Sequence, residues 1–387
     1  MKKAILFFLF SYCIATSWAQ VGIGTTTPVP SAALEIKDTT RGLLIPRMTM
    51  IQRNAISTPA TGLMVYQTDS TKGFWYFDGA VWKNVNTTSA NPNYGGKPVL
   101  ILSDSLTNAQ AAAKVAAEFG PNTQEIRIKN CINLTYVDLS MFTTVSSITV
   151  TDNPVLQILN LSNLKICNGY FNFNNCPLLT TLNLNSLEKV YHMSDLESIA
   201  FYFNNVKLSS IDCPNLKAVL GTMQITNNSY LTSLSFPLLS ANLMYLFVYS
   251  NVNLQTISFP SLTKIGVMTI TTNNALTSIN MSSLSGFTLG ITPAGTVESR
   301  ISLCPHLTTI VFGNMVTFYN LGFGTYGSTA LSVATVNDLL HSFASMNPPV
   351  SGKTFRFSGQ TPPAPPSGQG ITDKAFLIAH GNSVQTD

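Results

Sequence analysis

The side chains that could do acid–base or metal chemistry are few and scattered in this 387-residue chain. Its four histidines are His192, His306, His341 and His380, and their separations fit neither a catalytic triad nor a set of metal ligands. Only 17 residues are Asp or Glu, and none recurs at a fixed interval, so neither paired carboxylates nor repeated calcium ligands are indicated. We therefore predict that the protein is not an enzyme and has no metal or cofactor.

One glycine-containing string invites a cofactor interpretation. Residues 322–327 read Gly-Phe-Gly-Thr-Tyr-Gly and match the G-x-G-x-x-G pattern of dinucleotide-binding loops. That pattern is meaningful only between a strand and a helix, with an acidic residue about 20 positions further on. The surrounding sequence does not supply that setting, so we expect a glycine-rich loop without a cofactor.

Three aromatic residues are the candidates for ligand binding. Tyr202, Phe247 and Tyr249 alternate with apolar residues in segments that read as strands, so they should face away from the core. Residues at equivalent positions in other strands are mostly small and polar, with Arg127 and Lys129 as exceptions. Exposed aromatic side chains often anchor ligands, and sugars stack on them. We expect a patch about 10 Å across that binds a protein or a glycan. The alternatives are that aromatic residues simply favour strands, or that an inserted loop covers them.

A column of Asn and Cys recurs three residues after the first strand of each repeat. Its members are Cys131, Asn153, Cys176, Asn228, Asn251, Asn273 and Cys304. The fourth repeat is one residue short and offers Asn205 or Val206. An inward Asn can bond to unpaired backbone groups at such a turn, whereas Cys is a small buried hydrophobe with a weak donor. We predict a structural ladder at these positions.

A repeat of 22 or 23 residues would position these side chains. One apolar column contains Leu134, Leu156, Leu179, Leu208, Leu231, Leu254, Leu276 and Leu307. A second column runs from Leu164 to Leu284 and shares one long step with the first, which places an insertion near Tyr191 to Ala200. Pairs such as Ile126 and Ile128 have the period-two alternation of a half-buried strand. Stacking eight such coils over residues 125–315 would bury a continuous core.

The Asn and Cys column resembles that of leucine-rich repeats. The whole coil pattern resembles the receptor L-domain and related repeat proteins of bacterial surfaces, among them secreted proteins of Bacteroidota. The resemblance covers about residues 99–315 and implies a mostly β solenoid with short capping helices. Coils this short leave out the long convex helix of ordinary leucine-rich repeats and favour strands on more than one face.

The five cysteines after residue 19 first suggest disulfides, since the protein reads as exported. The repeat register favours reduced cysteines instead. Ladder cysteines two coils apart would lie about 9–10 Å from each other, beyond the Cα separation that a disulfide spans. Cys213 falls in the strand column of Phe236 and Phe259, and Cys167 has no assigned role.

Residues 20–85 form a separate N-terminal, β-rich module. Thr49 and Gln52 have the spacing of a capping box for a helix that ends at Ile56. Residues 62–68, 73–77 and 81–85 read as short strands, with a tight turn at Asp78-Gly79. The opening Val-Gly-Ile-Gly-Thr-Thr-Thr-Pro at 21–28 and the words that follow resemble a module common on secreted proteins of Bacteroidota and stretches of phage tail-fibre proteins. The resemblance implies export and display or oligomerisation.

The rest of the chain reads as connections and ends. Residues 86–97 are a linker by composition. Residues 98–124 are an N-terminal cap of the solenoid, with a strand at 99–102 and a helix from Thr107 to about Phe119. Residues 316–387 are a C-terminal cap and Pro-rich tail, with helices predicted over 336–346 and 373–380.

The first 19 residues read as a signal peptide cleaved after Ala19. Lys2 and Lys3 precede an apolar stretch from Ala4 to about Ala15, and small residues precede Gln20. No later run of about 18 apolar residues predicts a membrane span. The net charge of +4 is too diffuse for nucleic-acid binding. We expect a secreted or cell-surface protein.

Three functions fit these observations. The first is a secreted or cell-surface binding or adhesion protein that presents its repeat surface to a protein or glycan ligand. The alternative is a structural, fibre-like envelope component, in which the N-terminal module forms a homo-oligomer. The third is a polysaccharide-active β-helix enzyme, which a cluster of acidic residues on one folded face would favour.

Overall fold

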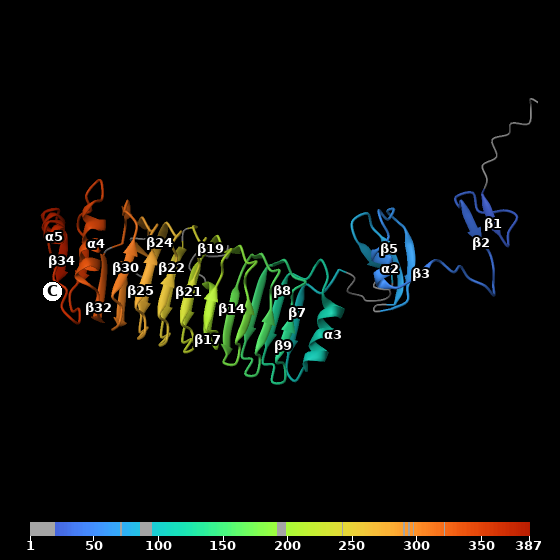
Figure 1. Ribbon diagram of the computed structural model, residues 1–387, viewed down its shortest axis with the longest axis horizontal. Helices are drawn as coiled ribbons and strands as arrows, with labels where there is room; N and C mark the ends of the chain where they lie inside the picture. Colours follow the sequence, from blue (N-terminus) through green and yellow to red (C-terminus); the bar gives the residue numbers. More distant parts are fainter. Residues whose placement is uncertain are drawn as a thin grey trace, which may run out of the picture. The chain divides into compact units, whose positions relative to one another are not determined.

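The computed structural model describes residues 20–69, 72–85, 95–191, 199–241, 243–288, 291–292, 295–296, 298–320 and 322–387. The chain divides into two compact units, unit 1 (Met1–Pro92) and unit 2 (Asn93–Asp387). It is mostly β, with predominantly parallel sheets (Figure 1). The predicted signal peptide, residues 86–94 of the predicted linker and residues 192–198 of the predicted insertion lie outside the described residues.

The described part of unit 1 contains two small sheets and one short helix. In chain order they are β1 (Val21–Ile23), β2 (Leu34–Ile36), β3 (Arg47–Met48), α2 (Met50–Asn54), β4 (Met64–Gln67), β5 (Gly73–Phe77) and β6 (Trp82–Asn84). β1 and β2 pair in parallel, whereas β4, β5 and β6 form an antiparallel meander with β3 added in parallel at its edge. The predicted capping box is confirmed, since Thr49 and Gln52 bond reciprocally at the start of α2. The Asp78 carboxylate accepts the N–H groups of Ala80 and Val81 in the turn between β5 and β6.

Unit 1 buries little apolar surface. Among its described residues Val65, at 1% exposure, is the one hydrophobic side chain that is fully buried. Arg53 is buried as well, and its guanidinium lies 3.9 Å from the ring centroid of Trp75 and 5.6 Å from that of Trp82. An arginine stacked on aromatic rings therefore occupies space that aliphatic side chains fill in most small domains.

Unit 2 is built on one long parallel sheet (Figure 1). The main path of the sheet is, in order, β7 (Val99–Ser103), β8 (Glu125–Lys129), β11 (Ser147–Thr151), β14 (Phe171–Cys176), β17 (Ile199–Val206), β20 (Thr222–Thr226), β22 (Leu243–Tyr249), β24 (Lys264–Thr271), β29 (Glu298–Cys304), β32 (Gly322–Thr329), β33 (Thr354–Phe357) and β34 (Ser383–Thr386). The register pairs Ile126 with Ile148 and Ile148 with Phe171. Hydrogen-bonded neighbours are thus one sequence repeat apart, which makes the sheets repeat-like.

Each repeat also contributes short strands to other sheets. One further sheet contains β9 (Tyr136–Asp138), β12 (Ile158–Asn160) and β15 (Thr181–Asn183), and another contains β18 (Ser210–Asp212), β21 (Ser233–Ser235), β23 (Thr256–Ser258), β25 (Ser278–Met281) and β30 (Thr309–Phe312). A third contains β10 (Thr144–Val145), β13 (Ile166–Cys167), β16 (Lys189–Tyr191) and β19 (Ala218–Leu220). β26 (Gly286–Phe287) and β31 (Thr317–Phe318) join the long sheet at its side, and β27 (Ile291–Thr292) and β28 (Gly295–Thr296) form an antiparallel pair.

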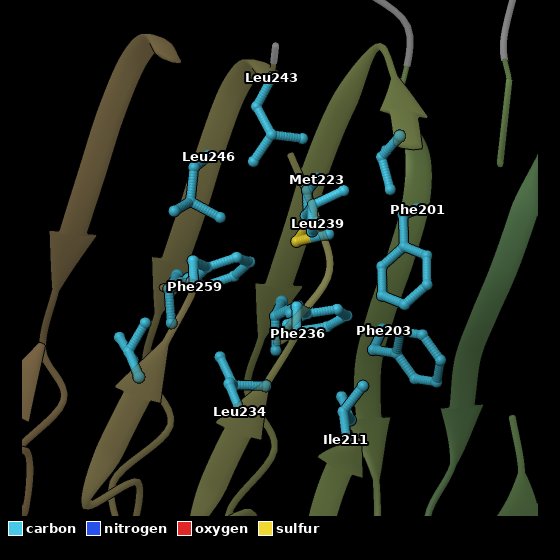
Figure 2. Packing of buried hydrophobic residues seen from close by; sticks show 14 of the residues in the cluster. Phe201, Phe203, Ile211, Met223, Leu234, Phe236, Leu239, Leu243, Leu246 and Phe259 are labelled. Atoms are coloured by element: carbon cyan, nitrogen blue, oxygen red, sulfur yellow. The ribbon is translucent and has the colours of Figure 1, made fainter. Parts of the chain in front are cut away.

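The core of unit 2 lies between the long sheet and the short strands. Figure 2 shows Phe201 and Phe203 of β17 and Met223 of β20 turned toward Leu234, Phe236 and Phe259. Equivalent rings stack on each other from one repeat to the next. The centroids of Phe173 and Phe203 are 4.9 Å apart at 6° between planes, and those of Phe236 and Phe259 are 4.9 Å apart at 9°. The leucines of the two predicted apolar columns belong to the same core, each at 4% exposure or less.

Helices cover both ends of unit 2 (Figure 1). α3 (Asn108–Glu118) begins at a capping box of Thr107 and Gln110 and packs beside β7 and β9. α4 (Val333–Ala344) and α5 (Gln369–Ala379) pack together at the other end. The long sheet continues past residue 315 through β32, β33 and β34, so the predicted cap also contributes strands. No helix in the described part of the chain is long and apolar enough to cross a membrane.

The prediction of a glycine-rich loop at residues 322–327 is wrong. These residues lie in β32, which pairs with β29 on one side and β33 on the other. Glycine is needed here because the neighbouring strand approaches closely. A Cβ on Gly322 would lie 2.3 Å from the carbonyl oxygen of Thr354, and one on Gly324 would lie 2.8 Å from the Cβ of Arg356.

Candidate functional site

The three predicted binding residues lie in neighbouring parts of the long sheet. Tyr202 is in β17, and Phe247 and Tyr249 are in β22, with β20 between them. Their side chains alternate with the core residues of the same strands, so they occupy the outward face. The register pairs Tyr202 with Gln224 and Gln224 with Phe247, which places these three residues in one row across the strands. We call Tyr202, Gln224, Phe247 and Tyr249 the aromatic strip.

The aromatic strip is partly buried rather than fully exposed. The Gln224 side-chain amide donates to the Tyr249 hydroxyl at 2.5 Å, so the polar member of the strip holds one of its rings. Burial, together with the nearby Tyr249 phenol, raises the pKa of Tyr202. The Tyr202 phenol therefore stays protonated at neutral pH and acts as a neutral hydrogen-bonding group.

Sequence reasoning missed a fourth aromatic side chain, Tyr245. It is 9% exposed and stacks on Phe247, with centroids 5.6 Å apart and 26° between planes. The signal was present, because Tyr245, Phe247 and Tyr249 are spaced by two and side chains with that spacing share one face of a strand. The Tyr245 ring therefore packs against the Phe247 ring and helps to fix its position.

Short polar side chains separate the aromatic residues of β17 and β22. In β20, Thr222 and Thr226 alternate with the core residues Met223 and Ile225, and they are nevertheless 2% and 1% exposed. The hydroxyl of Thr226 has no hydrogen-bond partner in the described part of the chain. The same holds for the side-chain oxygen of Asn172, which pairs with Tyr202 in the register.

The outward face around the strip is uncharged. Amide side chains lie beside it, with Asn204 donating to Asn174 at 2.6 Å and Asn227 donating to Asn204 at 2.8 Å. The nearest charged members of the outward rows are Glu125, Arg127 and Lys129 on β8 and Glu298 and Arg300 on β29. The paired positions between them are Thr149, Thr151, Asn172, Asn174, Tyr202, Asn204, Gln224, Thr226, Phe247, Tyr249, Thr269 and Thr271.

The seven members of the predicted Asn/Cys ladder are all fully buried. Asn251 shows the pattern: its Oδ1 accepts the backbone N–H of Asn228 at 3.0 Å, and its Nδ2 donates to the carbonyl of Ile225 at 3.1 Å. Asn153, Asn228 and Asn273 make the same pair of bonds to the preceding repeat. In the fourth repeat the N–H that bonds to Asn228 belongs to Val206, so Val206 rather than Asn205 occupies the ladder position.

A second column, which sequence reasoning missed, immediately precedes the ladder. Its residues have a positive φ between 50° and 59°, and they are Asn130, Asp152, Asn175, Asn205, Asn227, Ser250, Thr272 and Leu303. Five of these eight are Asn or Asp, the residues that tolerate the left-handed conformation best after glycine. Their recurrence was the available signal for a sharp turn at the end of each long-sheet strand.

All five described cysteines are free and buried. Burial raises the pKa of Cys131, Cys167 and Cys304 to about 11, and it also raises the pKa of Cys176 and Cys213. Cys167, unassigned from the sequence, lies in β13 with its Sγ 3.4 Å from the carbonyl oxygen of Tyr170. These thiols are packing groups with weak hydrogen bonds.

No group of three or more His, Cys, Asp or Glu side chains among the described residues could hold a metal ion. His306 is exposed, with its Nδ1 2.7 Å from the Asn274 carbonyl oxygen. His341 lies 3.1 Å from the Asp373 carboxylate at the α4–α5 contact. His192 lies outside the described residues. His380 contacts the carbonyl oxygen of Phe376, so each described histidine has a different hydrogen-bond partner.

Unit 1 presents a second candidate surface, which is apolar. Leu44 and Ile51 are 78% and 75% exposed, more than any other large hydrophobic residue described. Val21, Ile23, Val29, Leu34, Leu43, Met50, Met64, Phe74 and Val81 are exposed as well. Unit 1 is small and has little core, so a single copy leaves many of its large apolar side chains in solvent.

One comparison with known proteins bears on this surface. Residues 22–96 match the family model described as a phage tail like trimerisation region. The match covers the described part of unit 1 almost completely and extends to the start of unit 2. It is consistent with the tail-fibre resemblance of the N-terminal module. No curated protein and no solved structure matches the chain.

Proposed function

We propose that the protein is a structural, fibre-like envelope component in which unit 1 joins three copies of the chain. The observation that carries this proposal is the match of residues 22–96 to a trimerisation region, on a unit whose large apolar side chains face solvent. Burying such side chains contributes roughly 25 cal/mol per Å² of apolar surface, so association supplies the core that a single copy of unit 1 lacks.

Unit 2 is proposed to be a rigid arm on each copy. Its repeat-like parallel sheets and its Asn/Cys ladder support a leucine-rich-repeat or receptor L-domain-like solenoid. In such an architecture each repeat contacts its neighbours only, and the terminal elements protect the ends. The helices at both ends of unit 2 suit that role.

We also propose that the protein is exported and is not an enzyme. The support for export is the pattern of residues 1–19, namely two lysines, an apolar stretch and small residues before Gln20. The support for a non-enzymatic role is the scarcity of acidic residues and the separation of the described histidines. A cell-surface binding or adhesion role is the second candidate, and the outward aromatic strip favours it.

The solution mass of the mature chain, residues 20–387, tests the trimer. Light scattering should give three times the chain mass, and the thermal midpoint should rise with protein concentration, as it does for proteins that dissociate on unfolding. The double substitution Leu44→Asp and Ile51→Asp puts carboxylates on the most exposed apolar residues of unit 1 and should yield monomers.

A matched control is Val316→Asp, because Val316 is 66% exposed but belongs to unit 2. This variant should remain trimeric. A monomeric mass for the unaltered protein over a wide concentration range would refute the proposal, as would a trimer that survives the double substitution in unit 1.

A further inference from the structure

The outward face of the long sheet offers chemistry for one class of ligand in particular. The aromatic strip places rings on β17 and β22 and a side-chain amide on β20. Tyr202 and Phe247 are two strand steps apart, about 9.5 Å, which is comparable to the length of a disaccharide. The row that contains them continues with Asn172 and Thr149 beyond Tyr202 and with Thr269 beyond Phe247. A long molecule that lies across the strands would therefore meet alternating ring faces and hydrogen-bonding groups.

The charge of the face restricts the ligand. No outward row position between β8 and β29 carries an ionisable carboxylate, ammonium or guanidinium group. Charged ligands gain nothing from such a surface and lose hydration when they reach it. A ligand with neutral hydroxyls gives up less, because amides and hydroxyls replace water as partners.

Two hydrogen-bonding atoms beside the rings have no partner among the residues that the structure describes. The hydroxyl of Thr226, 1% exposed, lies next to Tyr249 in the register, and the side-chain oxygen of Asn172 lies next to Tyr202. Leaving buried polar groups unpaired is costly, and native proteins rarely do so without a reason. Hydroxyl groups of a ligand would satisfy both atoms after small movements of the side chains that cover them.

We propose that the aromatic strip binds an uncharged polysaccharide, with sugar rings stacked on Tyr202 and Phe247 and sugar hydroxyls bonded to the amides and hydroxyls between and beside them. A protein partner fits this face less well. Protein interfaces need a broad apolar core, whereas these rings are partly buried and separated by polar side chains. The inference concerns unit 2 and does not depend on the trimer.

Native gel electrophoresis through polysaccharide-loaded gels tests the proposal. The mature protein is run through gels that contain mixed-linkage β-glucan, α-mannan or dextran, and through a polygalacturonate gel as the charged counterpart. At least one neutral polysaccharide should retard the protein. The double substitution Phe247→Ala and Tyr249→Ala should weaken that binding by about tenfold or more, which is typical of losing central aromatic anchors.

Tyr202→Ala, on the neighbouring side of the strip, provides an independent variant and should also weaken binding if the double variant proves unstable. Tyr230→Ala is the matched control, since Tyr230 is 55% exposed and lies outside the strip. The proposal is overturned if no neutral polysaccharide retards the protein, if polygalacturonate alone does so, or if the strip variants bind as the control does. The unit 1 variants that break the trimer keep the strip and should still bind, with weaker retention from lower valence.

Discussion

At the scale of single residues, the asparagines of the Asn/Cys ladder bond their repeats to the preceding ones. Asn251 satisfies the N–H of Asn228 and the carbonyl of Ile225, and Asn251→Ala leaves both groups unpaired in the core. A buried group without a partner costs about 1–3 kcal/mol, so for two groups we expect the free energy of unfolding to fall by roughly 2–6 kcal/mol in a urea titration.

Asn253→Ala is the control for that measurement, because Asn253 is exposed and makes a single bond to the Ser229 carbonyl. Its effect should stay within about 0.5 kcal/mol. Asn251→Cys, which copies the residue used elsewhere in the ladder, should cost less than the alanine variant. Equal losses for Asn251→Ala and Asn253→Ala would show that the ladder does not stabilise the turns.

The buried thiols make a prediction about pH. Because burial raises the pKa of Cys131, Cys167 and Cys304 from 9.0 to about 11, these groups hold their protons more tightly in the folded state. Their contribution to stability is therefore complete below about pH 9 and is lost as the pH rises toward 11. At pH 8 a charged thiol reagent should label none of the five described cysteines in the folded protein and all of them after unfolding. Rapid labelling of the folded protein at pH 8 would contradict this.

The residues of the ladder could be found from the sequence because the repeat places one chemical type at one interval. The sequence could not show whether Asn205 or Val206 occupies the ladder position of the fourth repeat, because this depends on which backbone N–H bonds to the Asn228 side chain. The partial burial of Tyr202 was also beyond sequence reasoning. Alternation identifies the face on which a side chain lies, but the neighbouring strands decide how much of it they cover.

At the scale of elements, β32 depends on the absence of side chains at Gly322 and Gly324. Gly324→Ala would place a Cβ 2.8 Å from the Cβ and the carbonyl oxygen of Arg356, so β33 must move away. We expect a loss of about 1–3 kcal/mol, as for other overpacked sites, and faster amide hydrogen exchange in β33 and β34. Gly42→Ala meets no atom within 4 Å and should leave exchange in β33 and β34 unchanged. Unchanged exchange in both variants would mean that the approach of β33 tolerates a side chain.

β32 is also an element whose secondary structure could not be predicted from its own residues. The helix α2 was predictable because its capping box is a contact between residues three apart, and α3 was predictable because Thr107 can cap its first turn. β32 was not, because a glycine-rich segment forms a strand here only through its partners β29 and β33, and β33 is about 30 residues further along the chain.

At the scale of the whole molecule, the two units bury their apolar residues in different ways. Unit 2 stacks them in columns, which the sequence period indicates directly. Unit 1 leaves Leu44 and Ile51 in solvent, and no period distinguishes such residues from core residues. The overall apolar content of 45% does not show which apolar residues are buried and which are exposed. The oligomeric alternative therefore rested on resemblance until the exposed surface of unit 1 was known.

The register of the long sheet also means that the length of unit 2 along the stack is set by the number of its repeats. Five of the eleven neighbouring pairs on its main path are 22 or 23 residues apart in sequence, and each strand adds about 4.8 Å along the stack. Gaining or losing one repeat would leave the pairing of all others intact while shifting the far end by one such step. Unit 2 is in this sense a molecular ruler, and duplication of a short stretch of its gene would lengthen it in fixed increments.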